Sequence, residues 1–544
     1  MKLNEKEFNL IDEPWIRVMD GSCKVVEVSI LDAIVNAQKY KRLSGELPTQ
    51  DVAVMRLILA VLHTVVSRYD ECGDENDLED SEDDALNRWK GLWEQGCFPE
   101  NAVREYLEQW HERFWLFHPD RPFGQVAGLT AGTDYNSPKL NGEISESGNK
   151  IRLFSAYSGK EKSSLTYSQS ARWLLYLNAY DDTSAKPTKE GKAKAGGSLP
   201  SPGAGWLGKL GLIYISGNNL FETLMLNLVM INKDEVQYEQ KPLWEYENIS
   251  DAERTKIAIP DNLAELYTVQ SRRLLLNRCN GEVVSYRLLG GDFFDKENAF
   301  FEPMTVWRTP KKEGEDYTPK RHDSSRQMWR EFSVMYNEKN KNRRAGVINW
   351  YEIIFGNKCI PKTYIMKTAI ASVEYGDKDF FVRNVFTDTL SMHSEILSEV
   401  GANWRSDIET EIQHCESLAY EIGKFAQNLY VASGGDNSPK NKTFTELPGK
   451  VKEQLYYRLD MPFRKWLISI NPATMGEDKN KKIKEWQDEA RKIAADYANE
   501  LMDNTAECAL IGHIIKGEKK NEIYSAPKAR NIFNGNVKKI YEGK

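Results

Sequence analysis

The stretch IETEIQHCESLAYEIGKFAQNL, residues 408–429, decides the fold of the C-terminal part of the chain. Its apolar residues recur at alternating spacings of four and three, and they are Ile408, Ile412, Cys415, Ala419, Ile422, Ala426 and Leu429. Because an α-helix has about 3.6 residues per turn, this spacing places them on one stripe of a single long helix. We expect Gly434-Gly435 to end that helix.

Three further helices are predicted after this one. The first follows Leu447-Pro448 and runs to Leu467, with a kink expected at Pro462. The others cover residues 483–497 and 528–541. Long helices joined by short loops are typical of an antiparallel four-helix bundle. We therefore expect residues 387–544 to form an all-α domain of this kind.

The first 386 residues combine strand and helix patterns. Two short strands around a turn at Gly21 are predicted within residues 10–18 and 24–28. Amphipathic helices are predicted at residues 52–66, 102–117 and 165–179. The sequence thus predicts a mixed α/β domain over residues 1–386, and an α+β fold for the chain as a whole.

Length and composition exclude several classes of protein. With 544 residues the chain exceeds the ~250–300 residues at which one hydrophobic core stops growing, so at least two domains are expected. No apolar run reaches the ~20 residues of a membrane helix, and the N-terminus lacks the apolar stretch of a signal peptide. Seven scattered cysteines without a CxxC pair predict neither disulfides nor a zinc site. We expect a cytoplasmic protein without membrane contact.

The net charge of −8 is unevenly distributed. Residues 70–84 hold ten acidic residues and no basic one, and the rest of the chain carries a net charge of +2. Such a block of like charge predicts a solvated loop. The final segment, residues 510–544, carries eight basic and three acidic residues. This segment is compatible with a face that contacts a nucleic-acid duplex, and equally with a solvated terminal helix.

Two long polar segments interrupt the N-terminal domain, at residues 124–150 and 181–208. Stretches of this length are usually functional or disordered, and the second is not expected to contribute to a core. Residues 186–194 of the second segment hold four lysines against one acid, Glu190, and repeated glycines follow; the lysines are Lys186, Lys189, Lys192 and Lys194. Lysine charge together with glycine backbone suits close contact with phosphates, although a solvated loop remains an equal alternative.

Catalytic signatures are not found in the sequence. It contains no GxxxxGK[ST], GxGxxG, HExxH or GxSxG motif. The pair His322-Asp323 lacks the further ligands of a two-metal site, and the acidic stretch lacks EF-hand spacing. We expect no enzyme activity, metal or cofactor.

Short motifs in a fixed order along the chain resemble one family, the large subunit CasA of the type I-E CRISPR surveillance complex Cascade. The segments that carry the resemblance are residues 8–16, 56–60, 114–125, 171–174, 179–181, 205–211, 222–227, 302–308 and 462–467. The most specific of these are FWLFHPDRPFGQ at 114–125 and EPMTVWR at 302–308. Each motif alone is weak, and their order over nearly the whole chain is specific.

The resemblance implies a non-enzymatic DNA reader. Members of the family have a mixed α/β domain followed by a four-helix bundle, and they recognise the protospacer-adjacent motif (PAM) of double-stranded target DNA largely from the minor groove. They help to open the duplex, stabilise the R-loop and recruit a helicase–nuclease. Their partners are the CRISPR guide RNA and the other Cascade subunits. In such a system the protein recognises a short motif in the duplex, and base pairing with the guide RNA recognises the remaining target sequence.

The family's individual DNA- and RNA-contacting residues are matched less well in this sequence than its motifs are. The family's glycine loop corresponds to the segment after Tyr180-Asp181, which here lacks the early glycines. The minor-groove lysine corresponds to Lys296, and the aromatic residue facing the guide RNA end corresponds to Phe154. The wedge hairpin corresponds to the segment whose candidate DNA-contacting residues are Lys378, Asp379, Phe380 and Phe381, with Asp379 in place of the wedge glutamine. The two phenylalanines are either duplex-opening rings or strand residues of a core.

Two other functions stay open at this point. The chain could be a metal-dependent nuclease acting on the same DNA, which would need a cluster of carboxylates and histidines that the sequence does not present. It could also be a scaffold that binds protein subunits and reads no DNA. Cleavage assays with magnesium and gel shifts on targets with different flanking motifs separate these alternatives.

Overall fold

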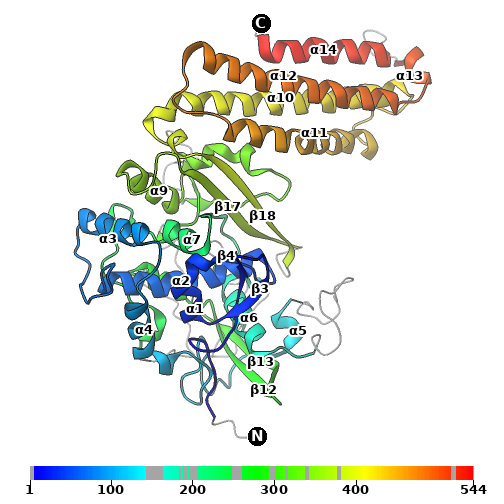
Figure 1. Ribbon diagram of the computed structural model, residues 1–544. Helices are drawn as coiled ribbons and strands as arrows, with labels where there is room; N and C mark the ends of the chain where they lie inside the picture. The colour runs from blue at the N-terminus through cyan, green and yellow to red at the C-terminus, as the bar shows by residue number, and fades with distance from the viewer. Residues whose placement is uncertain are drawn as a thin grey trace. The chain divides into compact units, whose positions relative to one another are not determined.

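The computed structural model describes residues 5–142, 163–182, 186–187, 193–194, 206–247, 260–292, 301–310, 312, 317–336, 342–376, 382–515 and 522–542. Helices and strands alternate in the first part of the chain and long helices dominate the last part (Figure 1). The chain divides into two compact units. The first comprises Met1–Ser324, Val334–Lys362 and Met366–Thr389, and the second comprises Ser325–Ser333, Thr363–Ile365 and Leu390–Lys544. The mixed content agrees with the expected α+β class.

A small antiparallel sheet opens the first unit. Its order is β3 (Val25–Val28), β2 (Ile16–Asp20) and β4 (Tyr40–Leu43), which confirms the strands expected around Gly21. Helix α1 (Ile30–Val35) follows β3. Helix α2 (Pro48–Arg68) is confirmed as well, and almost all of its side chains are buried. Among the described residues α2 is the one helix long and apolar enough to cross a membrane, and it is the core helix of this unit.

The prediction of a helix over residues 102–117 is wrong for its C-terminal part. Helix α4 (Glu100–Gln109) ends before Trp110, and β5 (Trp115–Phe117) is a strand paired with β1 (Glu7–Asn9). Bulky aromatic side chains favour an extended backbone, and pairing with β1 provides it with hydrogen bonds. The local apolar spacing did not reveal this long-range partner.

The acidic stretch is only partly the solvated loop that its charge predicted. Helix α3 (Glu82–Gln95) begins inside it, with the Ser81 hydroxyl accepting a hydrogen bond from the Asp84 backbone N–H. Acidic residues in a first turn are favourable because they lie at the positive end of the helix dipole. Leu78 is buried, and the Asp70 carboxylate accepts the backbone N–H groups of Cys72 and Asp74.

Two three-stranded sheets complete the β-structure that positions the site. One has the order β12 (Arg272–Cys279), β13 (Glu282–Gly290) and β6 (Thr133–Asn136), and the other β18 (Val382–His393), β17 (Ile365–Tyr375) and β9 (Leu212–Ile215). Strand β6 and helix α5 (Ser137–Leu140) lie in the segment that was expected to be structureless. The remaining described helices and strands of the unit are α6 (Tyr167–Tyr180), α7 (Leu220–Asn227), α8 (Leu263–Thr268), α9 (Gly346–Gly356), β10 (Ile231–Asn232), β11 (Glu235–Val236), β14 (Trp307–Arg308), β15 (Thr318–Pro319) and β16 (Asn342–Arg343).

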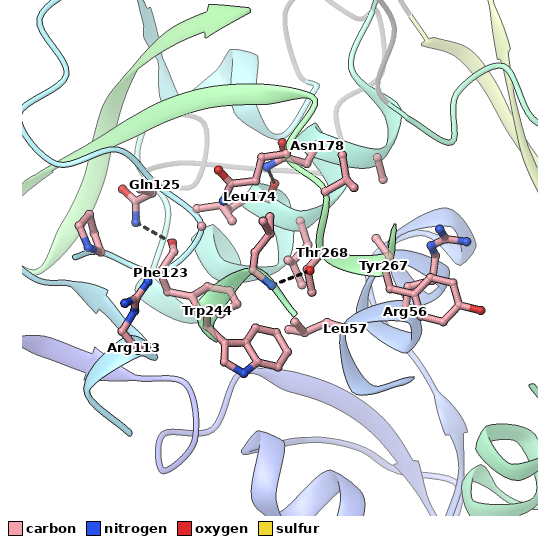
Figure 2. Close-up of a pocket in the computed structure, with 18 of the residues that line it drawn as sticks. Arg56, Leu57, Arg113, Phe123, Gln125, Leu174, Asn178, Trp244, Tyr267 and Thr268 are labelled. Carbon is pink, nitrogen blue, oxygen red and sulfur yellow. Dashed lines mark hydrogen bonds between the residues drawn. The ribbon is translucent and has the colours of Figure 1, made fainter. Parts of the chain in front are cut away.

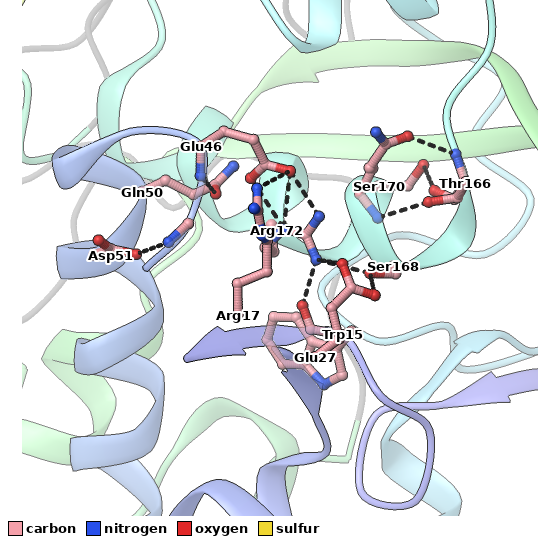
Figure 3. A network of polar contacts seen from close by, with 12 residues as sticks. Trp15, Arg17, Glu27, Glu46, Gln50, Asp51, Thr166, Ser168, Ser170 and Arg172 are labelled. Atoms are coloured by element: carbon pink, nitrogen blue, oxygen red, sulfur yellow. Dashed lines mark hydrogen bonds and ion pairs between the residues drawn. The ribbon is translucent and has the colours of Figure 1, made fainter. Parts of the chain in front are cut away.

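A buried arginine joins α6 to the first sheet (Figure 3). Arg172 is 2% exposed and donates hydrogen bonds to the Trp15 carbonyl and to the carboxylates of Glu27 and Glu46. Ser168, one turn earlier on α6, also accepts from its guanidinium at 2.7 Å. A buried charge must be paired, so these contacts fix where α6 lies against the β2–β3 hairpin.

Four long helices pack together in the second unit: α10 (Ala402–Ala432), α11 (Lys442–Ile468), α12 (Gly476–Asp503) and α14 (Ala526–Glu542). The short elements α13 (Cys508–Ile511), β19 (His513–Ile515) and β20 (Glu522–Tyr524) lie between α12 and α14. All seven apolar residues of the predicted stripe on α10 are buried. Trp329, from the segment Ser325–Ser333 that also belongs to this unit, is buried as well. Its ring stacks on Phe463 with centroids 4.3 Å apart, and its indole N–H donates to Asp460.

Helix α11 begins earlier than the sequence predicted. It starts at Lys442 and contains Pro448, although a proline without an N–H leaves the carbonyl four residues earlier without its helical partner. That carbonyl belongs to Phe444, and the Gln427 side chain on α10 donates to it at 2.9 Å. A side chain of a neighbouring helix thus compensates for the proline.

This compensation predicts the effect of replacing Gln427 by leucine. The Phe444 carbonyl would lose its donor, and we expect the second unit to lose about 1–2 kcal/mol of unfolding free energy. Urea unfolding followed by circular dichroism measures the loss. The matched control is Gln413→Leu, an exposed glutamine on the same helix, and an equal loss in that variant would contradict the role assigned to Gln427.

A second prediction concerns Asp51, in the first turn of α2 (Figure 3). Burial raises the pKa of its carboxyl from 3.8 to about 7, although the Gly45 N–H donates to it at 2.6 Å. The native state therefore binds this proton more tightly than the unfolded state. The stability that protonation provides is complete below about pH 4 and is lost as the pH rises through about 7, at ~1.4 kcal/mol per pKa unit.

Asp51→Asn keeps an acceptor for Gly45 and removes the titration. We expect its melting temperature to exceed that of the wild type by more at pH 8 than at pH 5. Differential scanning fluorimetry across this range measures the difference. The control Asp80→Asn makes the same change at an exposed position of the acidic stretch, and an equal pH-dependent gain there would overturn the explanation.

Candidate functional site

Most of the residues predicted to contact nucleic acid lie outside the described part of the chain. These are Phe154, Lys189, Lys192, Lys296, Lys378, Asp379, Phe380 and Phe381. For Lys186 and Lys194 the backbone is described, and the two residues lie opposite each other in the short ladder of β7 (Lys186–Pro187) and β8 (Ala193–Lys194). Their contacts with DNA or RNA stay predictions.

The structure does describe residues that flank the three segments predicted to contact DNA. The first segment, 183–205, follows Asp182 and precedes Trp206. The second, 293–300, lies between Asp292 and Phe301, and the third, 377–381, lies between β17 and β18. Although these segments are far apart in the sequence, their ends are joined by buried polar contacts within the first unit.

The first segment is anchored by two carboxylates. Asp181 pairs with the Arg272 guanidinium, and Asp182 pairs with the Lys139 ammonium. All four residues are more than nine-tenths buried. Arg272 also donates to the Asp182 carbonyl at 3.1 Å. Isolated buried charges are very costly, so both acids must stay beside their cations, and this requirement fixes the start of the segment.

The second segment begins at an equivalent anchor. Arg273, the neighbour of Arg272 in β12, pairs with Asp292 and donates to the Gln270 carbonyl at 2.8 Å. Successive side chains of a strand point to opposite faces, so the two arginines reach two different partners. The Asp292 backbone N–H also donates to the Gln270 carbonyl, at 2.8 Å. One strand thereby holds the beginnings of both segments.

The ends of the same two segments meet at Glu302. Its carboxylate forms a bidentate pair with Arg56, with both N–O distances 2.8 Å, and its side chain is 0% exposed. The Trp206 indole N–H donates to the same carboxylate at 3.3 Å. The guanidinium of Arg56 lies 4.3 Å from the centre of the Tyr267 ring. Trp206 and Leu207 are buried, so the expectation that residues 181–208 contribute nothing to a core is wrong at both ends.

The third segment is tied to the first by a tyrosine. Tyr375, at the end of β17, donates its hydroxyl to the carbonyls of Tyr180 and Asp181 at 3.0 and 3.1 Å. Burial raises the pKa of Tyr375 well above its ordinary value, so the hydroxyl stays a neutral donor. A Cβ at Gly208 would lie 2.0 Å from this hydroxyl oxygen, so glycine is required there.

We call this set of residues the loop platform: Arg56, Lys139, Asp181, Asp182, Trp206, Arg272, Arg273, Asp292, Glu302 and Tyr375. The sequence analysis did not identify Lys139, Arg272, Arg273 or Asp292 as important. A usable signal was the pair Arg272-Arg273 directly before the apolar run Leu274-Leu275-Leu276, because charges beside a buried run need partners. The other members fall within segments that carry the family resemblance or beside them.

A cavity of about 290 Å³ lies beside the loop platform (Figure 2). Asn178 and Trp206 belong to its lining, and its apolar walls include Leu57, Leu174 and Trp244. Asn178 also accepts the Arg272 backbone N–H at 3.0 Å, so the cavity and the platform share one framework.

Among the described residues, no three or more histidine, cysteine, aspartate or glutamate side chains are grouped so that they could hold a metal ion. The His322 ring nitrogen Nε2 lies 3.1 Å from the Leu212 carbonyl oxygen, as expected for an ordinary loop histidine.

The loop platform predicts a large effect for Arg272→Met. Asp181 would lose the cation beside it, and we expect a loss of roughly 3–5 kcal/mol in unfolding free energy. Limited proteolysis within residues 183–205 should also become faster. Arg287→Met is the matched control, because Arg287 makes an ion pair with Asp134 on the same sheet at a more exposed position, where solvent screening leaves such a pair little effect on stability. Similar losses in both variants would contradict a special role of the platform.

Comparisons with known proteins point to one family. The family model described as CRISPR-associated protein Cse1 matches residues 9–497. A CRISPR-associated protein CasA/Cse1 of Thermus thermophilus is 32% identical over 338 residues, which are 61% of this chain and 60% of that relative. The chain therefore spans about three fifths of the length of this curated relative in the alignment.

Solved structures share the fold over nearly the whole chain. The crystal structure of Thermobifida fusca Cse1 has a TM-score of 0.81 at 25% identity, with 99% of both chains covered. Cse1 from Acidimicrobium ferrooxidans has a TM-score of 0.78 at 22% identity, with 98% of both covered. A chain of a CRISPR RNA-guided surveillance complex has a TM-score of 0.65 at 16% identity, with 99% and 100% covered. The last two likenesses concern the fold alone.

Proposed function

Because the chain belongs to the CRISPR-associated Cse1 family, also called CasA, we propose that it is the PAM-reading large subunit of a type I-E CRISPR surveillance complex. In this proposal it binds double-stranded target DNA next to the guide RNA end, helps to open the duplex and stabilises the R-loop. It carries no catalytic activity of its own and works in the cytoplasm. Its partners are the guide RNA, the other Cascade subunits and a recruited helicase–nuclease.

The loop platform is the observation that carries this proposal. The three segments predicted to contact DNA are separated by more than a hundred residues at their extremes. The ends of the first two are held by the ion pairs of Asp181 and Glu302, and Tyr375, before the third, donates to the Asp181 carbonyl. Reading a short duplex motif needs several contacts in one register, and loops on a rigid base provide that precision. Lys296 in the second segment and Lys378 in the third would then approach one DNA region together.

The second unit supports the part of the proposal that concerns stabilising the R-loop after the duplex has opened. We interpret its four long helices as the four-helix bundle of the family, with the basic residues of the terminal segment directed to DNA after strand opening. Lys528 and Arg530 lie in the first turns of α14. Phosphate contacts of this kind hold a strand without reading its bases.

The two alternatives receive less support. A nuclease would need a cluster of metal ligands, and the described residues present none. A protein scaffold without DNA reading would not explain why buried ion pairs hold two of the three polar segments, because such pairs add little net stability.

The test uses the assembled complex with alanine at Asp379, Phe380 and Phe381. If these residues part the duplex, R-loop formation on intact double-stranded targets should fall at least tenfold, while targets with a pre-opened bubble beside the motif should be bound normally. The reason is that unstacking costs a few kcal/mol per base step and the bubble removes that cost. Gel shifts and R-loop footprinting measure both quantities.

Pairs of DNA targets that differ only in the flanking motif test whether the complex recognises that motif. The unmodified complex should prefer one flanking motif, and the bubble should not remove that preference. Equal loss of binding to intact and pre-opened targets would contradict a duplex-opening role. A complex that binds all flanking motifs equally would favour the scaffold.

A further inference from the structure

The cavity beside the loop platform has the composition of a ligand site rather than of a packing defect. Its volume of about 290 Å³ lies near the lower end of the ~300–1,000 Å³ found for small-molecule sites. Its lining combines four aromatic side chains, among them Phe123 and Trp244, with aliphatic side chains and several polar groups. The polar groups are unevenly placed, and two observations about them identify the chemistry of a ligand.

Two of the aromatic side chains that line the cavity, Phe123 and Trp244 (Figure 2), pack against a further aromatic side chain, Phe114. The Phe123 ring stacks on Phe114 with centroids 5.1 Å apart, and the Trp244 ring lies 5.0 Å from the same Phe114. The Trp244 indole N–H donates to the Tyr106 hydroxyl at 2.8 Å, so its polar edge is already used. Flat apolar faces of fixed orientation suit a planar ring, which can stack on them without further ordering.

The first polar observation concerns Gln270, which lines the cavity and is 5% exposed. Its Oε1 atom has no hydrogen-bond partner among the described residues. Its Nε2 atom would lie 3.7 Å from a Cβ built on Gly124, another lining residue with φ = +64°. Leaving a buried amide oxygen unpaired is unfavourable, so a ligand with a donor group there would recover this free energy.

The second polar observation is a pair of arginines in the lining. Arg113 donates to the backbone carbonyls of Tyr246 and Glu247 at 2.7 and 3.3 Å, and Arg121 is exposed. Burial and the positive charge of Arg121 both lower the pKa of Arg113. The two guanidinium groups therefore repel each other, although Asp120 and Glu247 also belong to the lining. An anionic group between the arginines would relieve the repulsion.

We propose that this cavity binds one nucleotide, with the base against Phe123 and Trp244, the Gln270 amide on the base edge and the phosphate beside Arg113 and Arg121. A glutamine amide offers a donor and an acceptor, the pairing that base edges use. An apolar protein side chain would fill the same volume but would leave Gln270 unpaired and the arginines without an anion. The proposal goes beyond motif reading, because the nucleotide would lie in a cavity of the first unit and not in a duplex groove.

The nucleotide has two possible sources, a free mononucleotide or an extruded residue of a bound strand. The first arm of the test titrates the purified full-length chain with each of the four ribonucleoside 5′-monophosphates by isothermal calorimetry. We expect saturable binding, with the corresponding nucleosides binding at least fivefold more weakly. The second arm uses a short single-stranded RNA with a photoreactive terminal base, and a crosslink at Phe123 or Trp244 that a mononucleotide does not displace would identify the strand as the source.

Two variants and two matched controls make the test specific. Gln270→Leu should weaken mononucleotide binding at least fivefold, whereas Gln38→Leu, which changes another buried amide oxygen without a partner, should not. Arg121→Ala should weaken binding and flatten its salt dependence, whereas Arg104→Ala, an exposed arginine paired with Glu100, should do neither. Unchanged melting temperatures show that the variants are folded.

Three results would overturn the proposal. They are the lack of saturable binding of any mononucleotide or RNA at millimolar concentration, binding that Gln270→Leu and Arg121→Ala leave unchanged, and a crosslink of the cavity to a protein subunit in the assembled complex. Motif discrimination by the assembled complex is measured separately. Failure of nucleotide binding with intact discrimination would therefore reject the cavity site and leave the proposed DNA reading in place.

Discussion

The two adjacent arginines at the start of β12 impose the constraint on which the rest of the first unit depends. Arg272 and Arg273 are 1% and 2% exposed, and neither charge can be buried without a carboxylate beside it. Their partners, Asp181 and Asp292, each stand next to a segment predicted to contact DNA. Buried ion pairs contribute modestly to net stability, yet breaking one is costly. Their main effect here is to select one arrangement of the chain, because any fold that separated these residues would leave isolated charges in the core.

Contacts between distant residues extend this constraint to the third segment. Arg56 lies in the core helix α2, and its partner Glu302 comes 246 residues later. Tyr375 reaches back by almost two hundred residues to the carbonyl of Tyr180. Each of these groups is buried and polar, so each must be satisfied in the native state. The first segment lacks the early glycines that the family resemblance led us to expect after Asp181, while its two ends are held by Arg272 and Glu302.

The sequence predicted those elements whose stability arises from their own periodicity. The stripe from Ile408 to Leu429 specified α10 because an amphipathic helix buries one face whatever its partner, and the alternation around Gly21 specified the hairpin of β2 and β3 in the same way. Predictions failed where a distant partner decided the outcome. Residues 115–117 form a strand because β1 offers hydrogen bonds, and Pro448 lies inside α11 because Gln427 supplies the missing donor. The loop platform consists of such long-range pairs, so the sequence alone could identify its segments but not their convergence.

The distribution of charge agrees with a reader that must not bind all DNA equally. The chain is acidic overall, with ten of its acids within residues 70–84, whereas the lysines expected to contact DNA lie in short segments. A net negative charge weakens long-range attraction to any duplex, because nonspecific affinity comes from neutralised phosphates. Binding then becomes strong only where several lysines, held at fixed positions by the loop platform, contact the duplex at the same time. Holding the first two segments on buried ion pairs and the third on the Tyr375 hydrogen bonds provides that register, since the ordering cost is met during folding instead of during binding. Under the proposed function, selectivity for a flanking motif would thus depend on residues that never touch the DNA.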